Sequence, residues 1–178
     1  MMKVVVDTNV LLVANDQHGD VSPDCVETCV RRLLALQAEG VVVVDDGFRI
    51  LGEYQRKARV SPAKGVGDLF LKWLLRNAGN PRHVQSVSIS EHAADHFDEF
   101  PDHDLQLEFD PPDRKFVAVA NSHPDKPPIW QAADCKWLNW SAALAVTGIS
   151  VDFLCPEDVC RFYEAKFPGS PVPALPGG

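Results

Sequence analysis

Several signatures of large protein classes are missing from this chain of 178 residues. No apolar run approaches the roughly 20 residues that a membrane-spanning helix needs, so we expect no membrane association. Cys-x-x-Cys pairs, the His-Glu-x-x-His motif and the Gly-x-Ser-x-Gly motif are absent, which argues against a zinc ribbon, a zinc protease and a serine hydrolase. The apolar run after Lys3 is too short for a secretion signal. We therefore expect a cytoplasmic protein whose five cysteines are reduced thiols.

The composition is that of an ordinary globular domain, with 46% hydrophobic and 24% charged residues. This length suits one domain with a sizeable core. We predict a single domain over residues 1–167, followed by a Pro/Gly-rich segment, 168–178, that we expect to be disordered.

Charge is distributed unevenly along the chain, whose formal net charge is −8. Residues 49–82 contain eight basic and two acidic side chains, a local charge of +6, whereas the rest of the chain, with nine basic and 23 acidic residues, carries −14. Residues 91–113 contain nine acids and no lysine or arginine. A basic segment can bind phosphates, although a charged run is often only a solvated surface. The nucleic-acid-binding candidates are Arg56, Lys57, Arg59 and Lys64.

Short β-branched runs alternate with segments of helical periodicity. Strands are predicted at 3–7, 41–44, 129–133 and 149–154. Helices are predicted at 22–40, 47–59, 61–79, 91–100, 111–120, 138–148 and 156–166. Such alternation predicts an α/β fold, a three-layer sandwich with a central, mostly parallel sheet flanked by helices.

Carboxylates from separate segments are expected at one edge of this sheet. Asp7 and Asp134 end two predicted strands, Glu53 lies in an otherwise largely apolar helix, and Asp110 and Asp113 begin another helix. Functional crevices of parallel sheets lie beyond the carboxyl ends of the strands. Crowded carboxylates repel unless a cation neutralises them, and hard oxygen ligands suit Mg²⁺ or Mn²⁺. Singly, each acid could be only a helix cap or a turn residue.

Three segments resemble the PIN domain family, a metal-dependent ribonuclease fold, over roughly residues 1–153. Residues 2–12 look like the opening of such a domain, 109–120 are similar to its third acidic motif, and 133–138 to its fourth. The resemblance implies that the metal site and catalysis depend on Asp7, Glu53, Asp113 and Asp134, with Asp110 as a further candidate ligand and Asn9 orienting Asp7.

The leading hypothesis is a Mg²⁺- or Mn²⁺-dependent nuclease that hydrolyses phosphodiester bonds, with RNA favoured over DNA, through water activated at the acidic site. The resemblance also implies two kinds of partner: an antitoxin or other regulatory protein, and a second copy of the chain in a homodimer. Two alternatives stay open. A phosphatase with an aspartyl nucleophile would normally have a second Asp where Asn9 stands. A non-catalytic binding module of the same fold is the other alternative.

Overall fold

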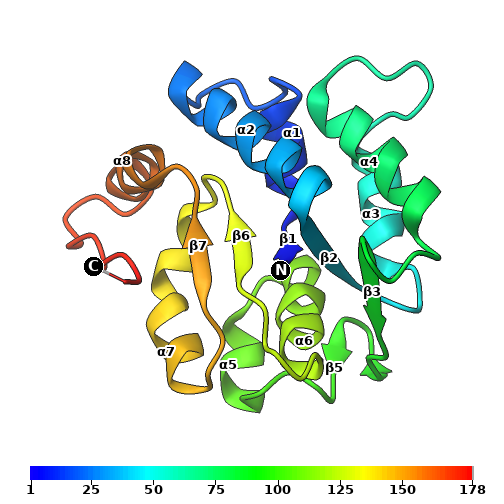
Figure 1. Cartoon of the computed structure of the whole chain (residues 1–178). Helices are drawn as coiled ribbons and strands as arrows, with labels where there is room; N and C mark the ends of the chain where they lie inside the picture. Colours follow the sequence, from blue (N-terminus) through cyan, green and yellow to red (C-terminus); the bar gives the residue numbers. More distant parts are fainter. Residues whose placement is uncertain (178) are drawn as a thin grey trace.

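A five-stranded sheet, parallel throughout, forms the centre of the computed structural model, which describes residues 1–177. Its strand order is β3-β2-β1-β6-β7 (Figure 1). The five strands are β1 (Met2–Val6), β2 (Gly40–Asp45), β3 (Val84–Val87), β6 (Ile129–Gln131) and β7 (Val151–Phe153). A separate antiparallel pair consists of β4 (Glu91–Ala93) and β5 (His96–Phe97).

Helices cover both faces of the sheet. The α-helices are α1 (Thr8–Ala14), α2 (Pro23–Glu39), α3 (Arg49–Lys57), α4 (Val66–Asn77), α5 (His103–Glu108), α6 (Arg114–Ser122), α7 (Ser141–Val146) and α8 (Pro156–Lys166), and the short 3₁₀ helices are η1 (Pro111–Asp113) and η2 (Cys135–Asn139). Helices α1, α2 and α4 pack together on one side, and α6 lies against β1, β2 and β6 on the other (Figure 1). The predicted three-layer α/β sandwich is therefore confirmed.

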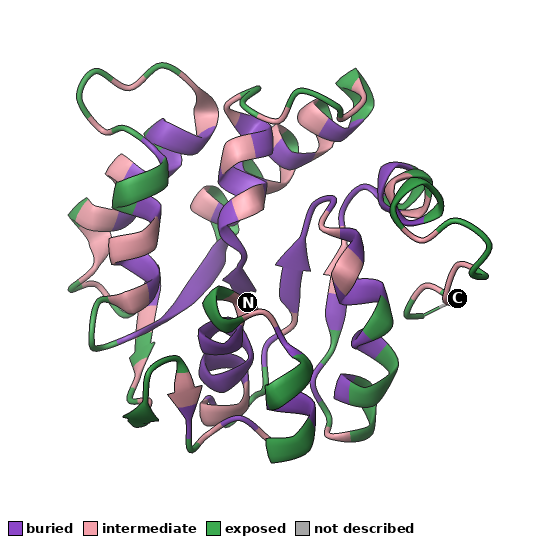
Figure 2. Cartoon of the chain, turned by 180° about the vertical axis from the view of Figure 1, so that it is seen from behind, coloured by how far each residue is buried: buried purple, intermediate pink, exposed green. Residues whose placement is uncertain are grey.

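The two valine runs of the sequence form strands β1 and β2. Val4, Val5 and Val6 of β1 are fully buried, and every residue of β2 is buried, so β2 is purple along its length in Figure 2. A continuous apolar run is what a strand covered on both faces requires. This is why the sequence pattern located both strands within one or two residues.

The order of the strands reverses next to β1. This strand pairs with β2 on one side and with β6 on the other, so the chain winds outwards in two directions from the β1–β6 pair. In open parallel sheets the ligand crevice lies beyond the carboxyl ends of the strands at such a reversal. Asp7 directly follows β1, and Asp134 follows β6 after two alanines.

The predicted helix at 91–100 is wrong, because this segment forms the β4–β5 hairpin. In a helix, Glu91 and Asp95, and Asp95 and Glu99, would lie four residues apart on one face, where like charges repel. In the hairpin Glu91 instead pairs with Arg49 at 2.8 Å, and the buried Phe97 exchanges two backbone hydrogen bonds with the Gln106 side chain.

Ser61-Pro62 does not begin a helix, which corrects the predicted start of the helix at 61–79. Helix α4 begins at Val66, after a loop whose backbone amides at Arg59 and Lys64 donate to the Asp68 carboxylate at 2.8 and 2.9 Å. Asp68 therefore ties the loop to the first turn of α4. Gly67 allows α4 to approach α1 closely, since a Cβ there would lie 2.1 Å from the carbonyl oxygen of Leu11.

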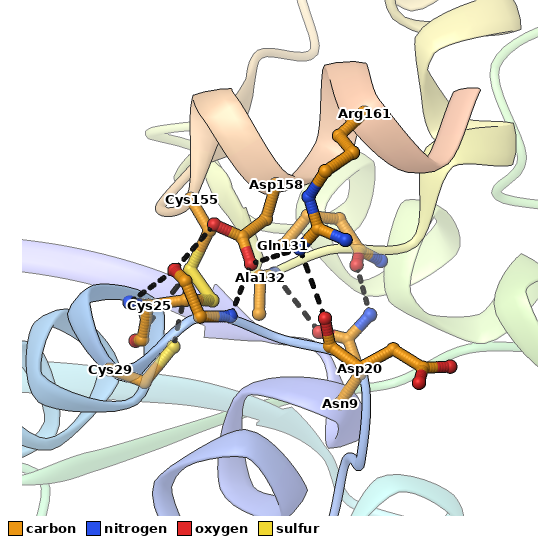
Figure 3. The surroundings of a disulfide bond; sticks show 10 residues. Asn9, Asp20, Cys25, Cys29, Gln131, Ala132, Cys155, Asp158 and Arg161 are labelled. Atoms are coloured by element: carbon orange, nitrogen blue, oxygen red, sulfur yellow. Dashed lines mark hydrogen bonds and ion pairs between the residues drawn. A yellow bond between two sulfur atoms is a disulfide. The ribbon is translucent and has the colours of Figure 1, made fainter. Parts of the chain in front are cut away.

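Cys25 and Cys155 form a disulfide that joins α2 to the residue before α8, which corrects the expectation of five reduced thiols (Figure 3). Cys29, Cys135 and Cys160 are free cysteines. The pairing depends on how α2 packs against the start of α8, and the spacing of cysteines in a sequence does not contain that information.

No helix within residues 1–177 is both long enough and apolar enough to cross a membrane. In the segment 168–178, predicted as a disordered tail, Val172 and Leu175 lie against a small apolar cluster between η2 and α8. Gly178 lies outside the described residues.

Candidate metal centre

Asp7 and Asp134 begin the turns that leave the two strands at the reversal point. Asp7 caps α1, and its Oδ1 accepts a hydrogen bond from the backbone N–H of Asn9 at 2.9 Å. Asp134 caps η2 in the same way, with Oδ1 accepting from the N–H of Lys136 at 3.1 Å. Each acid therefore has one oxygen held by the backbone, which leaves the other to face a ligand.

Asn9 joins the carboxyl ends of β1 and β6. Its Oδ1 accepts a hydrogen bond from the N–H of Ala132 at 3.0 Å, and its Nδ2 donates to Oε1 of Gln131 (Figure 3). The sequence predicts that Asn9 orients Asp7. In the structure the Asn9 backbone contacts Asp7, and the Asn9 side chain fixes the neighbouring strand.

The Asp7 carboxylate is buried, with 5% of the residue exposed, and its Oδ2 has no hydrogen-bond partner among residues 1–177. Burial raises the pKa of this carboxyl well above its ordinary value, and the charges of Asp113, Asp134 and Glu53 raise it further. An ionised acid in such a position requires a nearby cation. The unpartnered Oδ2 is thus the first sign of a cation site.

Asp113 and Asp134 share this electrostatic environment. Burial, followed by the charges of Asp134 and Asp110, raises the pKa of Asp113 to about 7. Burial is also the main cause of the raised pKa of Asp134, against which the nearby N–H and ammonium of Lys136 act. Within the described chain, neither acid nor Asp7 forms an ion pair. The structure therefore brings three unpaired acids together.

The other two acidic candidates each have a lysine partner. Glu53 on α3 binds the Nζ of Lys115 at 3.1 Å and accepts a hydrogen bond from Oγ1 of Thr8 at 2.7 Å through the same oxygen, Oε2. Asp110 pairs with Lys136 at 2.5 Å. Glu53 lies close enough to raise the pKa of Asp7, but its charge is already balanced.

Three unpaired carboxylates form a donor set that fits a hard divalent cation such as Mg²⁺ or Mn²⁺. Within residues 1–177, no three carboxylates have ligand oxygens all within 4.8 Å of one another. Mg²⁺ commonly keeps several water ligands and takes only one or two carboxylates directly. The spacing of Asp7, Asp113 and Asp134 is therefore compatible with an ion that is bound partly through water.

Three cysteine sulfur atoms form a second cluster of potential metal ligands. Cys25, Cys29 and Cys155 are the one set of three potential ligands in the described part of the chain whose ligand atoms all lie within 4.8 Å. Two of them form the disulfide, and burial raises the pKa of the Cys29 thiol to about 12. Since metals bind thiolates rather than disulfides or thiols, this cluster in its oxidised form is not a metal site.

The four basic candidates are exposed and form no ion pair within the described residues. Arg56 and Lys57 lie in the last turn of α3, one turn after Glu53, and Arg59 and Lys64 lie in the loop before α4. Asn15, at the end of α1, exchanges hydrogen bonds with Asp68 and so holds this loop against α1. Helix α1 has seven residues, or about 10 Å, between the loop and Asp7.

A cavity of about 360 Å³ opens beside Asp134 on the other side of the centre. Asn9 and Asp134 line it together with Lys166 at the end of α8 and the aromatic ring of Phe162. Lys166 is near enough for its charge to lower the pKa of Asp134. The cavity gives solvent and small groups access to Asp134.

Sequence reasoning missed two lysines, Lys115 and Lys136, as members of this centre. Lys115 precedes the apolar run 116–120 and is itself buried, with 8% of the residue exposed. A lysine beside such a run must bury its charge or find a partner, and this pattern could have indicated a nearby acid. Lys136 gives no comparable signal, because its partner Asp110 lies 26 positions away in the sequence.

No family model, curated protein or solved structure matches the chain.

Proposed function

We propose that this protein is a Mg²⁺- or Mn²⁺-dependent nuclease of the PIN type that hydrolyses phosphodiester bonds, in RNA rather than in DNA. The observation that carries the proposal is the buried, unpartnered Oδ2 of Asp7, which lies near Asp113 and Asp134 at the reversal point of a parallel sheet. The preference for RNA comes from the resemblance of the three acidic segments to PIN domains.

Each part of the site has a role in this proposal. Asp7, Asp113 and Asp134 would hold the ion, and Asn9 fixes the two strand ends from which Asp7 and Asp134 project. When bound, a divalent ion supplies an activated water and neutralises charge on the phosphoryl group. The exposed Arg56, together with the three other basic candidates, would bind the nucleic-acid backbone.

The test is the Asp7→Asn variant, assayed on a labelled single-stranded RNA with Mn²⁺ and with EDTA. We expect the unaltered protein to cleave the RNA in Mn²⁺ but not in EDTA. The variant should cleave at least about 100-fold more slowly, because loss of an ion ligand should cost at least as much activity as loss of a residue that only supports a ligand. Circular dichroism should show an intact fold, since the amide keeps the shape of the side chain.

Asp16→Asn is the matched control, because Asp16 is exposed at the far end of α1 and its side chain forms no hydrogen bond among the described residues. It should cleave like the unaltered protein. Undiminished Mn²⁺-dependent cleavage by Asp7→Asn would refute the proposal. A DNA strand of the same sequence, cleaved equally well, would refute the preference for RNA.

A further inference from the structure

We infer that the ammonium group of Lys115 takes the place of a second divalent cation, so that the centre binds one ion, at Asp7, Asp113 and Asp134, and Glu53 serves as the counter-ion of Lys115. This inference rests on the proposed function and concerns the number of ions at the same site. Two-metal nuclease sites hold ions about 3.5–4 Å apart and need carboxylates for both.

The first step is the division of the carboxylates into two groups. Glu53 and Asp110 each form an ion pair with a lysine, whereas Asp7, Asp113 and Asp134 form none within residues 1–177. The three unpaired acids are sufficient for one divalent ion. A second ion would need Glu53, whose negative charge already has a partner.

The second step is the burial of the Lys115–Glu53 pair. The two side chains are 10% and 13% exposed, respectively, and their contact is 3.1 Å. Lys115 also donates to the carbonyl oxygen of Pro112, and its Nζ lies 4.7 Å from the centre of the Phe116 ring. An ion that captured Glu53 would leave a buried ammonium without a counter-ion, which is strongly unfavourable.

The third step concerns Oε2 of Glu53, which already contacts two donor groups. This oxygen accepts the hydroxyl hydrogen of Thr8 at 2.7 Å in addition to contacting Lys115. Thr8 is adjacent to Asp7 in the chain, and Lys115 lies two residues after Asp113, so the segments that supply the unpaired acids also bind Glu53. Glu53 is thus held by Thr8 and Lys115, and its carboxylate neutralises the Lys115 ammonium beside the three unpaired acids.

The experiment is a calorimetric titration of the metal-free full chain with MnCl₂, which measures stoichiometry without any assay of cleavage. The unaltered protein should bind one Mn²⁺ per chain. Lys115→Met, which keeps an apolar stem but removes the charge, should bind a second Mn²⁺ at the freed Glu53. Lys136→Met is the matched control, because it breaks the more exposed pair with Asp110, and it should still bind one ion.

The double variant Lys115→Met/Glu53→Gln, which removes both charges of the pair, covers the possibility that Lys115→Met alone fails to fold. We expect this variant to bind one Mn²⁺ with an affinity within about threefold of the unaltered protein, whereas Asp134→Asn should lose at least about 30-fold. Two ions on the unaltered protein, one ion on a folded Lys115→Met, or a 30-fold loss of affinity in the double variant would each overturn the inference alone. No Mn²⁺ binding by the unaltered protein would overturn the proposed function as well.

Discussion

Asp113 and Lys115 lie two positions apart in the chain but in opposite electrostatic surroundings. Lys115 has a buried acid as its partner, and Asp113 has no ion-pair partner within the described residues. Burial and neighbouring acids raise the pKa of Asp113 from 3.8 to about 7. Such an acid destabilises the ion-free fold progressively as the pH rises through this interval, because the unfolded side chain ionises first.

We therefore predict that Asp113→Asn stabilises the protein in EDTA. At about pH 8 its Tm should exceed that of the unaltered protein by about 2 °C or more, since a gain of 1 kcal/mol corresponds to roughly 2–4 °C for a chain of this size. At about pH 5 the difference should shrink, because Asp113 is then protonated in the folded state. Thermal melts followed by circular dichroism measure both values.

The same variant should bind Mn²⁺ more weakly, and the exposed Asp104→Asn should change neither property. A lower Tm for Asp113→Asn than for the unaltered protein at about pH 8 would contradict this prediction, because it would mean that the Asp113 carboxyl stabilises the ion-free fold.

At the scale of elements, the disulfide joins two helices that are far apart in sequence. Cys25 in α2 and Cys155 before α8 are separated by 130 positions. Asp158 of α8 lies beside the disulfide (Figure 3). Its carboxylate accepts hydrogen bonds from the N–H and Oγ of Ser22 at 2.6 and 2.7 Å. A polar contact and a covalent bond therefore hold the same two helix starts together.

We predict that Cys25→Ser lowers the free energy of unfolding by about 2–4 kcal/mol, because it removes a constraint on a long loop of the unfolded chain. Its Tm should no longer respond to dithiothreitol, whereas that of the unaltered protein should fall. Cys160→Ser is the control, because Cys160 is a half-buried free cysteine. Titration of the denatured, unreduced protein should give three thiols, and a result of five would refute the disulfide.

The sequence predicted elements well where local pattern decides them. The valine run of β2 and the helix of 156–166 match the structure, because burial on both faces and proline at the first helical position leave clear signals. The hairpin at Glu91 and the loop before α4 were missed, since Arg49, Gln106 and Asp68 determine them from other parts of the chain. Asp7 and Asp134 could be proposed from strand ends, but the ion pairs that Lys115 and Lys136 form with Glu53 and Asp110 depend on packing.

At the scale of the whole molecule, the four basic candidates and the acidic centre lie in different electrostatic regions. The loop that contains Arg59 and Lys64 is separated from Asp7 by about the length of α1. A chain with a net charge of −8 repels nucleic acid in general, so the RNA binding that we propose would need this local positive surface.

We predict a weaker salt dependence of RNA binding when this surface is neutralised. A variant with glutamine at positions 56, 57, 59 and 64 should lose about 3 from the slope of log K against log salt, since each contact with single-stranded phosphate contributes about 0.7. Fluorescence anisotropy in EDTA, where cleavage is blocked, measures the slope. Arg31→Gln, an exposed change on α2, should leave it unaltered. An unchanged slope in the fourfold variant would place the RNA elsewhere.

The reversal of strand order next to β1 has a consequence for how the centre is assembled. Asp7 comes from the half of the sheet that contains β2 and β3, and Asp134 from the half that contains β7. The side chain of Asn9, two residues after Asp7, is hydrogen-bonded to the end of β6. Neither half alone supplies all three of the acids that we propose as ligands. Under the proposed function, docking of the amino-terminal and carboxy-terminal halves and binding of the ion would be thermodynamically linked, so each would strengthen the other.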